Sequence, residues 1–233
     1  MPETAPHIAS ATPEPWLEVI DSDSPLLLIA PHGGRAEPRT RSILNPKVND
    51  LYTADITRGL AERLGASALI NVAMDRNRID CNRIAQVVER APWMLELIAE
   101  RLAAMVARHG RATVLLIHGW NIIEPRLDFG LGLRHSDGEL RPPGSACVSA
   151  SDDFINGPLA GLADRLNRCG IKPTYGMRYP GGGLQNLLQA FSARHRQSPH
   201  APLRSISETS MSGQVDAAQL ELSVSVRMPG EFR

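Results

Sequence analysis

The chain of 233 residues is 42% hydrophobic, and its 25 basic side chains balance 25 acidic ones. This length and composition predict a single soluble globular domain with a substantial core. The absence of net charge excludes the strong global field with which proteins attract nucleic acid or an anionic membrane.

The cysteines and the first residues indicate a reducing compartment. Cys81, Cys147 and Cys169 are odd in number and widely separated, which argues against a disulfide framework or a thiolate zinc site. The first 15 residues lack the basic start and apolar core of a signal peptide, and no segment approaches the length of a membrane span. We expect a cytoplasmic protein with a flexible lead-in at 1–14 and one domain at 15–233.

Strand and helix patterns alternate along the first half of the chain. The first ordered segment is expected at 16–20, and a long loop at 33–49. Apolar runs predict strands at 26–30, 68–73 and 113–117. Helical periodicity predicts helices at 55–64 and 84–109, the second divided by Pro92. The alternation predicts an α/β protein with three α/β/α layers around a mainly parallel, mixed sheet.

The second half is less regular. Residues 120–153 read as irregular apart from a strand at 128–133. We expect helices at 159–167 and 184–194, with a short extended segment at 172–178 between them. Strict alternation predicts a last strand at 217–226, in which Glu221 lies on the solvated face with Ser223 and Ser225.

Two histidines stand out because each follows an aliphatic strand and each precedes a glycine. Since the carboxyl ends of parallel strands meet at one edge of a sheet, His32 and His118 are expected to converge. Two histidines and a carboxylate with one open position form a catalytic zinc site. Glu37, in the loop after His32, is the nearest candidate carboxylate. Asp50 and Asp55 are alternatives, although acids there also favour the start of a helix.

Polar groups elsewhere in the chain can bind an anion. Asn82 and Arg83 offer several donors that can grip a carboxylate, although helix capping by Asp80 or Asn82 also explains this segment. Arg178, just before the glycines at 181–183, is a second candidate anion contact. The glycine run lacks the Lys-Ser/Thr ending of a nucleotide-binding loop.

With these motifs in this order, the chain resembles the N-formylglutamate amidohydrolase family, within the wider group of zinc-carboxypeptidase-like hydrolases. The resemblance spans about Leu26 to Val226 and rests on four pieces: Pro31-His32-Gly33-Gly34, Asp80-Cys81-Asn82-Arg83, Ile117-His118-Gly119 and Gln219-Leu220-Glu221. The stretch from His32 to Pro38 is also similar to the metal-binding segment of poly-γ-glutamate hydrolases. Cys81 departs from the usual leucine, and residues 120–151 have no counterpart in the family.

The resemblance implies a phosphorylase/hydrolase-like fold and a role for each matched residue. His32, Glu37 and His118 would bind Zn2+, Asn82 and Arg83 would hold a substrate carboxylate, Glu221 would be the general acid/base, and Arg76 would stabilise the oxyanion. The implied reaction is hydrolysis of the amide bond of an N-acyl amino acid such as N-formylglutamate.

The implied partner is therefore a small carboxylated amide, with no nucleic acid, no membrane and an oligomeric state left open. Three alternatives remain. The first is a related zinc hydrolase for γ-glutamyl or peptidoglycan-derived amides, and the second is an inactive homologue that binds acyl-amino acids. The third is a hydrolase with Cys81 or Cys147 as its nucleophile.

Overall fold

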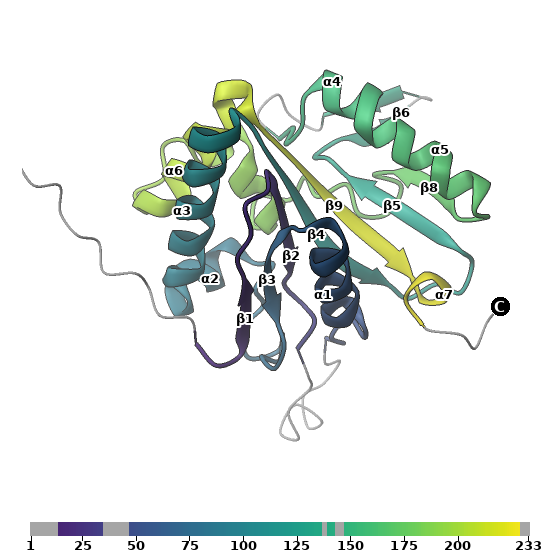
Figure 1. The fold of residues 1–233 in the computed structure, drawn as a ribbon, viewed down its shortest axis with the longest axis horizontal. Coiled ribbons are helices and arrows are strands. Elements are labelled where there is room, and N and C mark those ends of the chain that lie inside the picture. The colour runs from purple at the N-terminus through teal and green to yellow at the C-terminus, as the bar shows by residue number, and fades with distance from the viewer. Residues whose placement is uncertain (1–13, 35–46, 137–138, 143–146, 229–233) are drawn as a thin grey trace, which may run out of the picture.

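A seven-stranded mixed sheet runs through the computed structural model, which describes residues 14–34, 47–136, 139–142 and 147–228 (Figure 1). The strand order is β1-β3-β2-β4-β9-β5-β8. Four neighbouring pairs are parallel (β2/β3, β2/β4, β4/β9 and β5/β8), and two are antiparallel (β1/β3 and β5/β9). The predicted mainly parallel, mixed sheet is confirmed. The strands are β1 (Leu17–Ile20), β2 (Leu26–Ala30), β3 (Ser67–Asn71), β4 (Ala112–Trp120), β5 (Arg126–Gly130), β8 (Lys172–Tyr175) and β9 (Val215–Ser223), with β6 (Arg134–Ser136) and β7 (Glu139–Arg141) forming a separate pair.

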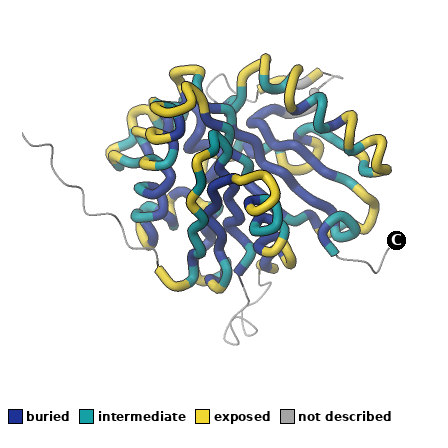
Figure 2. The backbone as a smooth tube through the Cα atoms, viewed as in Figure 1, coloured by how far each residue is buried: buried dark blue, intermediate teal, exposed yellow. Residues whose placement is uncertain are grey.

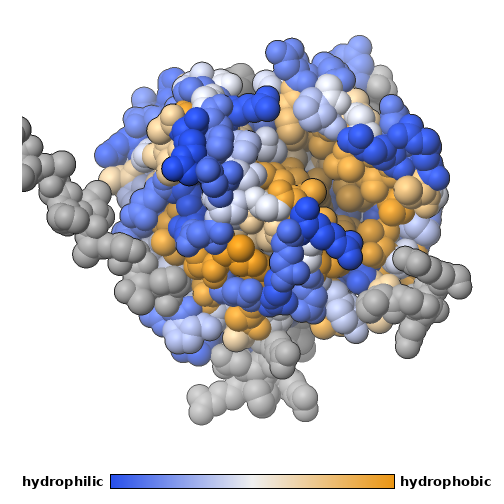
Figure 3. All heavy atoms as spheres, in the orientation of Figure 1, coloured by the Kyte–Doolittle hydropathy of each residue, from blue (hydrophilic) through white to orange (hydrophobic). Residues whose placement is uncertain are grey.

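Helices cover both faces of the sheet, which gives the three predicted layers. One face packs against α2 (Ile84–Arg90), α3 (Pro92–His109) and α6 (Ala201–Thr209). The other face packs against α1 (Thr53–Leu64) and α5 (Ala160–Arg168). Two further helices are short: α4 (Asp152–Phe154) precedes α5 in the chain, and α7 (Val224–Arg227) follows β9. Figure 2 shows the buried strands between these layers. Figure 3 shows hydrophilic side chains along α1 and α5, with hydrophobic ones visible between the two helices.

Local chemistry explains where the predicted helices begin and end. α1 ends at Gly65, whose φ of 59° lies in the left-handed region that glycine adopts without steric cost. Pro92 occupies the first position of α3 and separates it from α2, as predicted, because proline lacks the N–H that a helix interior needs. No helix among the described residues is both long and apolar enough to cross a membrane.

Several predictions for the second half were wrong. Residues 184–194 do not form one helix but 3-10 helices at Leu187–Phe191 and Ala193–His195. The Asn186 side chain accepts from the Leu188 N–H and starts the first of them. The last strand ends at Ser223, and α7 follows it from Val224. The helix α6 was not predicted. In the 120–153 segment, the strand expected at 128–133 is β5, with β6 and β7 in addition.

The prediction for Glu221 was wrong as well. β9 lies between β4 and β5, and helices cover both faces of the sheet there, so side chains on both sides of the strand are buried. Glu221 is 4% exposed. Its alternation with serine therefore does not mark a solvated face. The strand that carries His118 also extends further than expected, through His118 to Trp120.

Candidate metal centre

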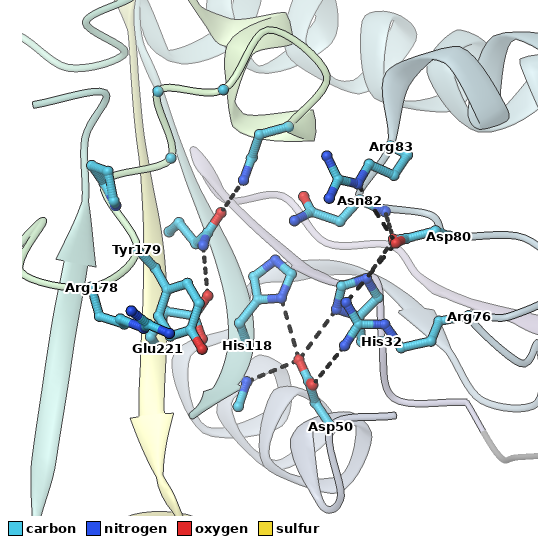
Figure 4. A pocket seen from close by; sticks show the side chains of 17 residues that line it. His32, Asp50, Arg76, Asp80, Asn82, Arg83, His118, Arg178, Tyr179 and Glu221 are labelled. Carbon is cyan, nitrogen blue, oxygen red and sulfur yellow. Dashed lines mark hydrogen bonds and ion pairs between the residues drawn. The ribbon is translucent and has the colours of Figure 1, made fainter. Parts of the chain in front are cut away.

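The loop after β2 and the carboxyl-terminal part of β4 bring the two histidines together. His32 follows β2 by two residues, and His118 lies within β4. Their ring centroids are 4.8 Å apart, with the rings edge to face (Figure 4). Gly34 permits this path of the chain, because a Cβ there would lie 1.9 Å from the carbonyl oxygen of Met74.

Asp50 is the carboxylate that meets both histidines. It precedes α1, and its carbonyl accepts from the backbone N–H and the hydroxyl of Thr53. Its Oδ2 lies 3.3 Å from His32 Nδ1 and 3.3 Å from His118 Nδ1, and it accepts from the Gly119 N–H at 2.9 Å. The candidate ligand atoms of the three residues all lie within 4.8 Å of one another. His32, Asp50 and His118 therefore form a possible metal site.

The donors of this group fit a small divalent cation. The distances of 3.3 Å from Asp50 Oδ2 to the Nδ1 atoms of His32 and His118 exceed the roughly 2.9–3.0 Å typical of N–H···O hydrogen bonds. Ligands about 2.0–2.1 Å from a tetrahedral ion are themselves about 3.3–3.4 Å apart. Two nitrogens and one carboxylate oxygen are also a ligand set that suits zinc.

The proton on His32 supports the same conclusion. His32 Nε2 lies 2.7 Å from Asp80 Oδ1, which as a carboxylate oxygen can only accept, so Nε2 carries the proton. In the neutral ring the lone pair then lies on Nδ1, where it faces Asp50 Oδ2, a second acceptor. A cation between these two atoms removes their repulsion. His118 Nε2 is buried and has no partner among the described residues.

Asp80 contacts His32 at Nε2, the ring nitrogen that does not face Asp50. It is 1% exposed, and it also accepts from Lys47 Nζ at 2.8 Å and from the Asn82 N–H at 3.1 Å. Burial opposes ionisation of this carboxyl, but the contacts with His32 and Lys47 outweigh burial and hold its pKa well below the ordinary value. Burial likewise opposes ionisation of Asp50, and the two histidines hold its pKa low when they are protonated and donate to it. Both carboxylates are therefore charged at neutral pH.

Arg227 fixes the backbone on both sides of the possible metal site. Its buried guanidinium donates to the carbonyls of Leu51 (2.7 Å), Leu222 (3.0 Å) and Trp120 (3.4 Å). It therefore ties the segment after Asp50 to the end of β4. A Cβ on Gly119 would lie 2.6 Å from this guanidinium. Arg227 was not predicted from the sequence, because nothing in its local sequence marks it.

Glu221 stands beside His118 in the register of β4 and β9. Burial raises its pKa to about 7, while its attraction to His118 and the hydrogen bond from Gln219 Nε2, 2.6 Å from Glu221 Oε1, act in the opposite direction. On its other side, Asp128 accepts from Thr174 Oγ1 and from the N–H groups of the loop at 177–179. Asp128 thereby positions Arg178 and Tyr179.

The two histidines, Asp50, Asp80 and Glu221 line one cavity of about 310 Å³. Figure 4 shows Asn82 and Arg83 on one side of it and Arg178, Tyr179 and Glu221 on the other. Asn82 Oδ1 accepts from the Leu187 N–H. Arg83 is exposed, and Arg178 forms no ion pair with any described residue but lies 5.9 Å from the Tyr179 ring centroid.

The structure gathers most residues selected from the sequence, whose individual roles stay predictions. The cavity is lined by His32, Arg76, Asn82, Arg83, His118, Arg178 and Glu221. Glu37 lies outside the described residues. Asp55 is exposed on α1, pairs with Arg58 and does not line the cavity. Cys81 and Cys147 are buried and do not line the cavity.

Comparison with known proteins supports the fold. No protein-family model and no curated protein matches the sequence. The structure is similar to that of N-formylglutamate amidohydrolase from Ralstonia eutropha JMP134, with a TM-score of 0.54, 16% identity, and coverage of 93% of this chain and 90% of that one. Isoform 2 of uridine phosphorylase from Schistosoma mansoni matches with a TM-score of 0.36, 9% identity, and coverage of 87% and 78%. The first match shows that this chain has the fold that the sequence resemblance implied.

Proposed function

We propose that this protein is a zinc-dependent amidohydrolase that cleaves the amide bond of an N-acyl amino acid. The observation that carries the proposal is the convergence of His32, Asp50 and His118, with Glu221 in register beside His118. The fold shared with an N-formylglutamate amidohydrolase supports the same class of reaction.

His32, Asp50 and His118 are the residues that would hold the zinc ion, with Asp50 in the place that the sequence resemblance assigned to Glu37. When bound, zinc lowers the pKa of a coordinated water and polarises a carbonyl group. Asp80 keeps the proton of His32 on Nε2, and so leaves Nδ1 free as a ligand.

Glu221 is the proton carrier of this proposal. Its buried carboxylate lines the cavity beside His118, and Gln219 holds one of its oxygens. It accepts a proton from the attacking water and returns it to the leaving amine nitrogen. Proton transfer of this kind contributes about 10²–10⁴-fold to enzymatic rates.

Three arginines supply positive charge to the cavity, and they and Asn82 supply hydrogen-bond donors to the substrate. Arg76 contacts Asp50, and its Nε is buried with no partner among the described residues, so this N–H remains as a donor to the developing oxyanion. Asn82 and Arg83 line the same cavity and orient the substrate through its carboxylate, while Arg178, on the opposite side of the cavity, adds positive charge that faces the substrate.

A hydrolysis screen with paired variants tests the proposal. We expect the zinc-loaded protein to hydrolyse at least one member of a panel of N-acyl amino acids and γ-glutamyl amides. Glu221→Gln should lower kcat by at least about 100-fold while zinc stays bound. Glu208→Gln, an exposed acid on α6, should retain wild-type turnover. Full activity in Glu221→Gln, or no turnover of any amide by the wild type, would contradict the proposal.

A further inference from the structure

The cleft continues past the histidines into a second cavity of about 430 Å³. Lys47, Val48, Trp120 and Asn121 line this second cavity and do not line the first. Both cavities share five lining residues, and Asp50 is one of them. The two cavities therefore meet at the possible metal site.

Of the residues that line only the second cavity, Val48 and Trp120 are apolar, and Lys47 and Asn121 are polar. Val48 is 61% exposed, and the rings of Trp120 and Tyr179 meet edge to face with centroids 6.0 Å apart. The Arg178 guanidinium lies near the Tyr179 ring. An exposed aliphatic side chain, an aromatic pair and a cation suit a flat group that stacks on one side and meets positive charge on the other.

The position of the cavity identifies which part of a substrate it faces. In the proposed function, the substrate carboxylate lies at Asn82 and Arg83 in the first cavity, and the scissile carbonyl lies beside Asp50. The substituent on the acyl carbon then points away from Asn82, into the second cavity. In a formyl group that substituent is a single hydrogen. The remaining 430 Å³ would hold on the order of ten water molecules, at about 30 Å³ each.

We infer that the natural substrate carries an acyl group larger than formyl, with a flat body that packs against Val48, Trp120 and Tyr179. This inference rests on the proposed function, because that function sets the direction of the substrate in the cleft. It assigns the second cavity as the acyl subsite and its lining as the source of acyl specificity.

Binding to zinc-loaded Glu221→Gln tests the subsite without turnover. We expect calorimetry to show that N-benzoylglutamate binds at least about tenfold more tightly than N-formylglutamate, since burying a phenyl-sized group is worth that much. Adding Val48→Trp, which narrows the second cavity, should remove this preference. Leu64→Trp, at a similarly exposed aliphatic residue outside both cavities, should preserve it.

Equal affinity for the two compounds, or a preference that Val48→Trp leaves intact, would overturn the inference. Failure of the proposed function is distinguishable from this result. If the wild type hydrolyses formyl and benzoyl compounds equally well, the amidohydrolase stands and the acyl subsite falls. If the benzoyl preference in binding depends on Val48 but no amide is hydrolysed, the subsite stands and the amidohydrolase falls.

Discussion

We expect Asp80→Asn to weaken zinc binding without unfolding the protein. In the wild type, the buried Asp80 carboxylate lies 2.7 Å from His32 Nε2 and keeps the proton on that nitrogen. Asparagine has the same shape and retains an accepting oxygen, but it lacks the negative charge. The variant therefore makes the His32 ring a weaker donor to a metal ion.

The structure sets the size of this effect. Partners of metal-bound histidines typically contribute 10–100-fold to metal affinity, which is about 1.4–2.7 kcal/mol. Asp80 also pairs with Lys47 Nζ at 2.8 Å and lies 3.9 Å from Arg76 Nη2. The variant removes the negative charge that faces these two cations, so their repulsion of a metal ion adds to the loss. We therefore expect a decrease close to 100-fold.

Competition with a chromophoric chelator measures the zinc dissociation constant. Asp23→Asn is the matched control, because this exposed aspartate pairs with Arg108 and does not line the cavity. Thermal unfolding of both variants in EDTA separates a metal effect from a folding defect. An Asp80→Asn dissociation constant within about twofold of the wild-type value would refute the reasoning, since twofold is only about 0.4 kcal/mol.

Three further predictions concern stability and reactivity. Arg227→Met leaves the carbonyls of Leu51, Leu222 and Trp120 without this donor, so it should lower the free energy of unfolding in urea by about 3 kcal/mol. The control Arg108→Met, at an exposed arginine, should lower it by under about 0.5 kcal/mol. Equal effects of the two substitutions would contradict the role of Arg227. In metal-free protein, burial raises the Glu221 pKa from 4.5 in the unfolded chain to about 7. Between pH 4.5 and pH 7 the folded state therefore binds more protons than the unfolded state. The free energy of unfolding of the wild type thus falls as the pH rises through that range. Relative to Glu221→Gln, the wild type should lose up to about 3 kcal/mol from pH 4 to pH 8, and parallel pH profiles would show that Glu221 titrates normally. N-ethylmaleimide should label Cys169 alone in the native protein, because Cys169 is exposed and Cys147 is buried, and because burial raises the pKa of the Cys81 thiol to about 12. Labelling of a second thiol before unfolding would contradict this prediction.

The sequence predicted the elements whose signals are local. The apolar run at β2 has the predicted bounds, and Pro92 and Gly65 divide or end helices where expected. The 3-10 helices after the glycine run were not predictable in the same way. Their start depends on Asn186, and Leu187 N–H reaches the Asn82 carbonyl, about a hundred residues away in sequence.

The part of the candidate site that could be predicted from the sequence is the pair of histidines, because each follows an apolar run. His32 and His118 were found from their position after aliphatic runs, and the structure places them together. Asp50 was named only as an alternative, because its partners lie 18 and 68 residues away and no periodic pattern connects them. Glu221 was assigned to solvent from alternation, which fails when both faces of a central strand are covered.

Zinc content is the most direct test of the central claim that His32, Asp50 and His118 hold a metal ion. Equilibrium dialysis followed by metal analysis should find about one zinc per chain in the wild type and under about 0.2 in Asp50→Ala. Asp55→Ala, at an exposed acid five residues further along, should retain about one. A full equivalent of zinc in Asp50→Ala, together with its loss in Glu37→Gln, would contradict the account.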